Sequence, residues 1–268
     1  MTKSSTINER VEKFYLPRIT AARQKLSSTI GAKLTALEMA PEVLERFLIE
    51  FCATGVHMTE PVEGWIRRAG DRCIQVGLPA LGRSLEKHAE HEANHHLMMI
   101  ADTRHLVACW NARQRPKLDA DALLQKGSTP ATQAYTKLHE DVIASSTPFG
   151  QLAIEYEIEG LSTTLGPPLM NQCKRLLGPA ITQGLSFLAE HIEVDQGHTL
   201  FNERQLEKLL TEHADFIEPL VRAGAAALEA YGKFLTECLE VAEGEASSAG
   251  LTRRPRQDAH TVQAYENS

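Results

Sequence analysis

The chain has 268 residues, 43% of them hydrophobic, and a formal net charge of -7. This length is enough for one domain with a sizeable core. The acidic balance argues against non-specific binding to nucleic acid or to anionic membrane surfaces, since both need a basic face. Five cysteines without a CxxC pair argue against a disulfide framework and a zinc ribbon.

The N-terminal stretch is polar, and no window approaches the roughly 18 apolar residues of a membrane span. These features predict a soluble, cytoplasmic protein with a small-molecule partner. Both a monomer and a homodimer are compatible with the sequence.

Helix start and stop signals divide the chain into long helices and predict an all-α single domain over residues 1–242. The first helix is expected from Ile7 to Ser28, with an interruption at Pro17. Pro41 opens a second helix that continues towards Trp65, and Leu78-Pro79 opens a third that reaches Gln114. A polar loop with one turn of helix follows over residues 115–130.

The second half of the chain repeats this pattern of helices opened or closed by proline and glycine. The expected helices end near Ala144, run from Thr147-Pro148 to Gly166, form a short piece, and then run from Gly178-Pro179 to Leu210 and from Ala214 to Ala242. Residues 243–268 are small and charged, which predicts a disordered tail.

Acidic residues and histidines share a helix face in two segments of the chain, and two glutamates share one in a third. Glu92 and His95 are three residues apart, so both side chains can reach one ion. His191, Asp195 and His198 form one stripe over two helical turns.

Between these two segments, AIEYEIEG places Glu155 and Glu159 on an apolar face, where a carboxylate is costly to bury unless it is paired or binds a metal. A Glu-x-x-His pair alone occurs by chance, but the three features together favour a metal site. Carboxylates mixed with imidazoles suit iron or manganese better than structural zinc.

The segments HAEHEANHHLMMIAD, YEIEG and HIEVDQGH, in this order, resemble the heme-oxygenase-like diiron oxidases. That resemblance covers residues 88–198 closely. It implies the seven-helix fold shared with heme oxygenase, thiaminase II and the pyrroloquinoline quinone synthase. The family includes the fatty-acid decarboxylase that forms terminal alkenes and a para-aminobenzoate synthase.

Carried over by position, the family's metal ligands fall on six residues of this chain: Glu92, His95, Glu159, His191, Asp195 and His198. The resemblance therefore implies two irons per chain, Fe(II) or Fe(III), with O2 as co-substrate. The alkene-forming member has a further glutamate where this chain has Val56 to Met58. Glu60 is the expected substitute, with Glu63 and His57 as weaker ones.

The other histidines are expected to be non-ligands. His88, His91 and His96 crowd the segment around His95, where only one or two of the four can reach a shared centre. The remaining ones are expected at the surface: His105, His139, His213 and His260.

The resemblance, together with these residues, implies an iron-dependent oxidase or oxygenase acting in biosynthesis on a small organic substrate. Three carboxylates against two dications would leave the site cationic, which favours a substrate with a carboxylate. Three other interpretations stay open: a ferritin-like di-metal bundle, a cofactor-free thiaminase-like enzyme with a nucleophilic cysteine, and a metal- or ligand-sensing module.

Overall fold

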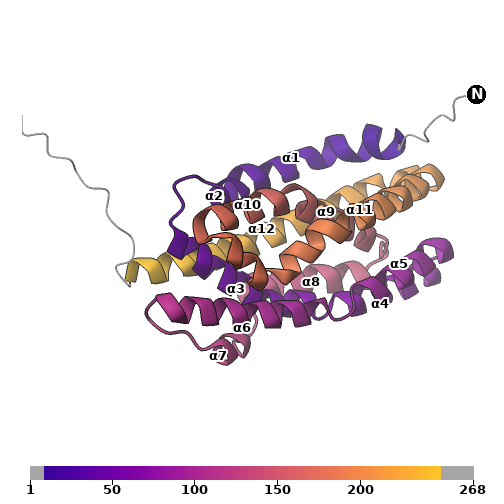
Figure 1. Ribbon diagram of the computed structural model, residues 1–268. Coiled ribbons are helices and arrows are strands. Elements are labelled where there is room, and N and C mark those ends of the chain that lie inside the picture. The colour runs from indigo at the N-terminus through magenta and orange to yellow at the C-terminus, as the bar shows by residue number, and fades with distance from the viewer. Residues whose placement is uncertain (1–8, 249–268) are drawn as a thin grey trace, which may run out of the picture.

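The computed structural model describes residues 9–248, and this part of the chain is helical without a strand (Figure 1). The predicted all-α class is confirmed. Over the same residues, no helix combines the length and the apolar character that crossing a membrane would require.

The helices follow closely the positions that proline and glycine predict. The main ones are α1 (Leu16–Leu26), α3 (Pro41–Thr59), α4 (Val62–Gln75), α5 (Pro79–His91), α6 (His95–Arg113), α8 (Pro130–Ala144), α9 (Gly150–Thr164), α10 (Gly166–Leu177), α11 (Ser186–Glu212) and α12 (Ile217–Ser248). Shorter pieces lie beside them: η1 (Val11–Tyr15), η2 (Ser27–Gly31), α2 (Ala32–Leu34), α7 (Ala120–Leu124), η3 (Pro179–Gly184) and η4 (Ala214–Phe216).

The first helix differs from its predicted form, because Pro17 does not interrupt it. Proline lies in the first turn of α1, directly after the π-helical turn η1, where its missing N–H is tolerated. Helical backbone then continues through η2 to Leu34.

Helix α12 is the central element of the bundle, and it packs against α1, α3, α8 and α9. Its buried side chains include Leu228, Phe234 and Leu239, which join one core cluster with residues of the other helices. Burial of this continuous apolar surface supplies the main stabilising free energy of such a fold.

The α4–α5 hairpin depends on two glycines that face each other. A Cβ on Gly70 would lie 2.8 Å from the carbonyl oxygen of Gly82, and one on Gly82 would lie 2.6 Å from the carbonyl oxygen of Gly70. This close approach fixes α5, which leads directly to the predicted ligand Glu92.

The helix expected from Leu78 to Gln114 is broken in two. α5 ends at His91, and α6 begins at His95 after Asn94, whose φ of 69° is left-handed. Asparagine is one of the few residues that adopt this conformation readily. Glu92 and His95 therefore flank a turn instead of lying on one continuous helix.

Asp102 of α6 fixes the start of α11. Its carboxylate accepts hydrogen bonds from the backbone N–H groups of Ser186 and Phe187, at 2.9 Å each, and from the Ser186 hydroxyl. The first N–H groups of a helix lack partners within the helix, so a buried carboxylate at this position is favourable.

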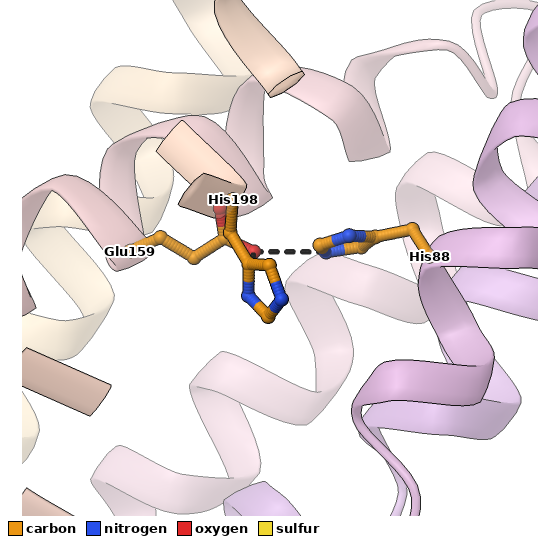
Figure 2. Close-up of side chains that lie close together, drawn as sticks. All are labelled: His88, Glu159 and His198. Carbon is orange, nitrogen blue, oxygen red and sulfur yellow. Dashed lines mark ion pairs between the residues drawn. The ribbon is translucent and has the colours of Figure 1, made fainter. Parts of the chain in front are cut away.

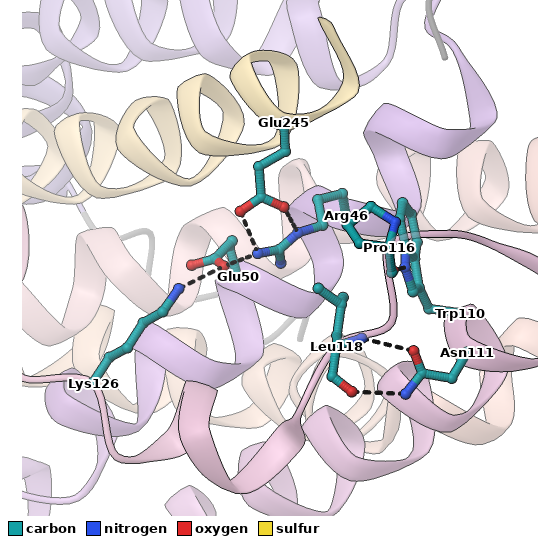
Figure 3. A network of polar contacts seen from close by, with 8 residues as sticks. All are labelled: Arg46, Glu50, Trp110, Asn111, Pro116, Leu118, Lys126 and Glu245. Carbon is teal, nitrogen blue, oxygen red and sulfur yellow. Dashed lines mark hydrogen bonds and ion pairs between the residues drawn. The ribbon is translucent and has the colours of Figure 1, made fainter. Parts of the chain in front are cut away.

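The C-terminal end of α12 extends beyond the predicted domain boundary. The helix runs to Ser248, so the tail expected from residue 243 is helical over its first six residues; residues 249–268 lie outside the described part. Arg46, buried in α3, pairs there with Glu245 and Glu50 (Figure 3). The exposed Glu245 thus ties the last turns of α12 to the buried guanidinium of Arg46, a contact that the polar sequence of this segment does not reveal.

The loop between α6 and α7 is also anchored by side chains. Trp110 Nε1 donates to the carbonyl oxygen of Pro116 at 2.9 Å, and Asn111 exchanges two hydrogen bonds with the backbone of Leu118 (Figure 3).

Candidate metal centre

Three parts of the bundle place histidines and acids around one point: the α5–α6 turn, α9 and α11. Two groups of possible ligand atoms result, each within 4.8 Å of one another. The first group is His88, Glu159 and His198, and the second group is Glu92, His95 and His191.

The first group joins residues from three different helices (Figure 2). His88 of α5 and Glu159 of α9 approach from opposite sides, and Nε2 of the imidazole lies 2.8 Å from Oε1 of the carboxylate. His198 of α11 points at the same place, with Nδ1 3.8 Å from Glu159 Oε1. Both His88 and Glu159 are buried.

The second group lies at the α5–α6 turn. Glu92 Oε2 is 3.0 Å from His95 Nδ1, and the rings of His95 and His191 are 4.8 Å apart between centroids. His191 Nδ1 lies 2.8 Å from the carbonyl oxygen of Phe187, so this nitrogen donates its proton there and Nε2 is left free. Such a contact fixes both the tautomer and the orientation of a ligating imidazole.

One carboxylate connects the groups, and a second lies beside His198. Glu92 directs Oε2 to His95, as above, whereas its Oε1 lies 3.5 Å from His198 Nδ1. Asp195 is 1% exposed, and its Oδ1 lies 3.3 Å from the same His198 nitrogen. Glu92 thus has one oxygen towards each group.

Five buried atoms in this region make no hydrogen bond to any described residue: His88 Nε2, Glu159 Oε1, both carboxylate oxygens of Asp195, and His198 Nδ1. A buried polar atom without a partner is costly, and several side by side need an explanation. Atoms that share one metal at about 2.0–2.2 Å lie about 3 Å from each other without bonding to each other. The residues present therefore fit a metal ion.

The pKa values of the two glutamates in the groups shift in opposite directions. Burial and the nearby Asp195 carboxylate raise the pKa of Glu159. Burial also works to raise the pKa of Glu92, but its contact with His95 outweighs this and lowers the pKa to about 2. Bound divalent ions would favour the ionised form of every acid here.

A small cavity of about 80 Å³ adjoins the two groups. Glu92, Glu159, His191 and Asp195 are among the residues that line it. The rest are largely apolar or aromatic: Gly55, Met58, Met99, Phe187, Tyr231 and Phe234, among others. A more voluminous hollow of about 820 Å³ runs along α12 at the surface, but none of the predicted ligands lines it. Of these two, the small cavity is the one that the candidate ligands line.

Glu60, the expected seventh ligand, is not part of either group. It caps the end of α3 and is exposed. Glu63 pairs with Arg67 at 2.7 Å, and His57 contacts the carbonyl oxygen of Lys126 at 2.8 Å. The part of α3 where the resemblance places the further glutamate lines the cavity with Gly55 and Met58, and neither residue is an acid.

His88 is a candidate ligand that the sequence analysis did not include. It was assigned to the non-ligands, yet it lies in the first group. A signal was present, because His88-x3-Glu92-x2-His95 repeats the spacing of His191-x3-Asp195-x2-His198. The structure brings the first histidine of one stripe to the last histidine of the other, so the two stripes run antiparallel.

The surface assignment of His139 is also wrong. This residue is 1% exposed and stacks on Trp65 with ring centroids 4.1 Å apart. His260 lies outside the described residues.

Asn202 supports the first group from α11. It is fully buried, and its Nδ2 donates to Glu159 Oε2 at 2.6 Å. That bond leaves Glu159 Oε1 directed at His88 and His198.

No protein-family model and no curated protein sequence matches this chain. Among solved structures, a domain of unknown function with a heme oxygenase-like fold from Shewanella denitrificans OS217 is similar, with a TM-score of 0.68 and 15% identity. The match covers 89% of this chain and 95% of that one.

A TenA homolog from Pseudomonas syringae pv. tomato DC3000 is similar with a TM-score of 0.64 and 12% identity, over 89% of this chain and 99% of that one. At such identities the likeness establishes the fold alone. The chain therefore has the predicted heme oxygenase-like fold and not the ferritin-like alternative. Membership of the diiron oxidases stays a prediction.

Proposed function

We propose that this chain is a non-heme diiron protein that activates O2 to oxidise a small organic substrate. The observation that carries the proposal is the pairing of two groups, each with two imidazoles and one carboxylate. Buried atoms of the first group and of Asp195 lack hydrogen-bond partners, which supports a cation there. Two histidines and one carboxylate are the ligand set that non-heme iron(II) oxygenases use, because it leaves coordination positions open.

In this proposal the first group holds one iron and the second group holds the other. Glu92, with one oxygen towards each group, would be shared between them, and Asp195 would complete the site. Ferrous ions there would supply electrons for the reduction of O2.

The protein's own part is to orient the ligands and to keep water out. Phe187 does both, since its carbonyl oxygen fixes His191 while its ring lines the cavity. Met58, Met99 and Phe234 add apolar walls, which limit the access of water to the reacting groups.

A cofactor-free, thiaminase-like hydrolase is the second candidate, and the likeness to the TenA homolog favours it. Such an enzyme needs a reactive cysteine. All five cysteines lie within the described residues, and none of them lines the cavity beside the two groups. Burial raises the pKa of Cys173 to about 12, so this thiol would be a poor nucleophile.

Metal content and oxygen consumption test the proposal together. Protein reconstituted anaerobically with Fe(II) should retain iron and should consume O2 faster than free Fe(II) when air is admitted. His95→Ala should lose most of this consumption, whereas His96→Ala, outside both groups, should keep it. Iron bound without oxygen consumption would indicate a sensor, and thiamine hydrolysis by metal-free protein would indicate the second candidate.

A further inference from the structure

The small cavity is also lined by a polar patch that belongs to neither group of candidate ligands. Glu155 of α9 and Tyr135 of α8 are buried there, and Tyr231 of α12 lies with them in the cavity wall. The rings of Tyr135 and Tyr231 are 6.0 Å apart between centroids.

Glu155 is held in place from behind. Its Oε1 accepts a hydrogen bond from Gln151 Nε2, and the same nitrogen lies 2.9 Å from Nδ1 of His139. His139 is in turn stacked on Trp65. All of these side chains except Trp65 are polar groups within the core, so the chain of contacts orients Glu155 at some cost in burial.

The groups that face the cavity lack partners. Neither phenol hydroxyl, nor Oε2 of Glu155, makes a hydrogen bond to any other described residue, although both Glu155 and Tyr135 are more than nine-tenths buried. Buried polar atoms are normally paired, so a ligand is the natural partner for these three.

An ammonium group fits the patch best. It donates in three directions, and the patch offers three oxygens, one of them on a carboxylate. The ring of Phe234, whose centroid lies 5.6 Å from that of Tyr231, also lines the cavity and can add cation–π attraction. The carboxylate of an anionic ligand in the same position would lie beside the acidic side chain of Glu155 instead of a basic one.

Charge balance points the same way. Burial and the neighbouring Glu159 carboxylate raise the pKa of Glu155 to about 8, and a cation beside it would favour its ionised form. With Glu155 ionised, four carboxylates line the region instead of the three counted from the sequence, and two divalent ions would be neutralised by them. The surplus of positive charge that favoured an anionic substrate is thereby removed.

We propose that the cavity takes the protonated amine of a small primary alkylamine, held by Glu155, Tyr135 and Tyr231. This inference names a substrate class for the proposed function and rests on it. The volume of about 80 Å³ limits the ligand to a short chain, roughly the space of two or three water molecules in the liquid. The carbon chain would lie between the patch and the metal groups.

Melting midpoints can test this with n-propylammonium chloride as the probe and with sodium propionate and n-propanol as comparisons. The full-length protein is measured with Mn(II) and without added metal, at matched ionic strength and about pH 7.5, where an alkylamine is protonated. A ligand that binds the folded state raises the midpoint with concentration, which gives an apparent Kd. Propylammonium should bind the tightest of the three.

Three variants locate the binding. Glu155→Gln should weaken propylammonium by about tenfold or more, because it replaces a charge-assisted hydrogen bond. Tyr135→Phe and Tyr231→Phe should each weaken it by roughly threefold to tenfold. Glu193→Gln removes an exposed acid of α11 and should leave the affinity unchanged.

The inference is overturned if propionate or propanol binds at least as tightly as propylammonium, or if Glu155→Gln binds the amine like the wild type. Metal content of the same samples separates the two proposals. Bound metal without amine binding contradicts the amine site alone, whereas amine binding by protein that retains no metal contradicts the diiron site alone.

Discussion

The imidazole rings of His88 and His198 pack edge to face with centroids 5.1 Å apart. His95 and His191 make the corresponding contact at 4.8 Å. Two stripes of equal spacing thus meet head to tail, which gives each metal group one histidine from the α5–α6 region and one from α11. This near-symmetry predicts that losing either histidine of a pair damages one group more than the other.

Replacing His88 tests the residue that the sequence analysis had excluded. His88→Ala should lower the iron bound after anaerobic reconstitution from about two to about one per chain, because the first group would keep only one imidazole. Iron is measured by mass spectrometry after gel filtration. His96→Ala is the matched control and should bind iron like the wild type; equal iron in His88→Ala would remove His88 from the site.

Asn202 should matter for metal affinity although it would touch no metal. Asn202→Leu keeps the size of the side chain but removes the hydrogen bond to Glu159, and loss of such support typically costs about 10- to 100-fold in affinity. Competition with a fluorescent chelator measures the change.

The neighbouring variant Thr199→Val serves as the control for Asn202. It removes a buried hydroxyl that has no hydrogen-bond partner among the described residues. If both variants bind metal like the wild type, Glu159 does not need Asn202.

Two glycines of long helices should respond in opposite directions. A Cβ on Gly224 would lie 2.4 Å from the Tyr15 hydroxyl and 3.0 Å from Glu157 Cγ, so Gly224→Ala should lower the free energy of unfolding by about 1–3 kcal/mol. Gly197→Ala meets nothing within 4 Å and should raise it by up to about 1 kcal/mol. Urea titrations measure both; a stable Gly224→Ala protein would show that Tyr15 can move aside.

His139 should make the protein sensitive to acid. Burial lowers its pKa from 6.5 to about 3, so above about pH 6.5 it is neutral in both the folded and the unfolded state. Between these values only the unfolded chain binds the proton, and stability falls as the pH falls, by up to about 1.4 kcal/mol per pH unit.

In His139→Phe this contribution is absent. The variant should be less stable than the wild type at neutral pH, since Gln151 loses a partner, and the difference should shrink towards pH 5. Urea unfolding at several pH values measures it. Parallel stability curves for the two proteins would contradict a neutral, buried His139.

Local signals in the sequence predicted most of the helices. Pro41, Pro79 and Pro130 open helices in the structure, as a first-turn proline should. The break at Asn94 was missed because the Glu-x-x-His spacing was interpreted as part of one continuous helix, although asparagine is a weak helix former that adopts left-handed backbone. The end of α12 was missed because its ion pair with Arg46 joins residues that are 199 positions apart.

Candidate ligands that share one helix were predicted from their spacing along it. Candidates that depend on how different helices pack against each other were predicted less well. His191, Asp195 and His198 share a face of one helix, so their proximity follows from helix geometry alone. Glu60 was chosen by its place in a comparison of helices, and its direction depends on where α3 ends. Glu155 was noted on the face of Glu159, but only the packing of α8 and α12 shows that it faces the cavity.

The most direct test of the diiron proposal is the position of metal in crystals grown anaerobically with Fe(II). Anomalous difference density recorded at the iron edge should show one peak among His88, Glu159 and His198 and a second among Glu92, His95 and His191. Crystals that contain iron but show no peak at either group would contradict the account. A single iron ligated by other residues would contradict it as well.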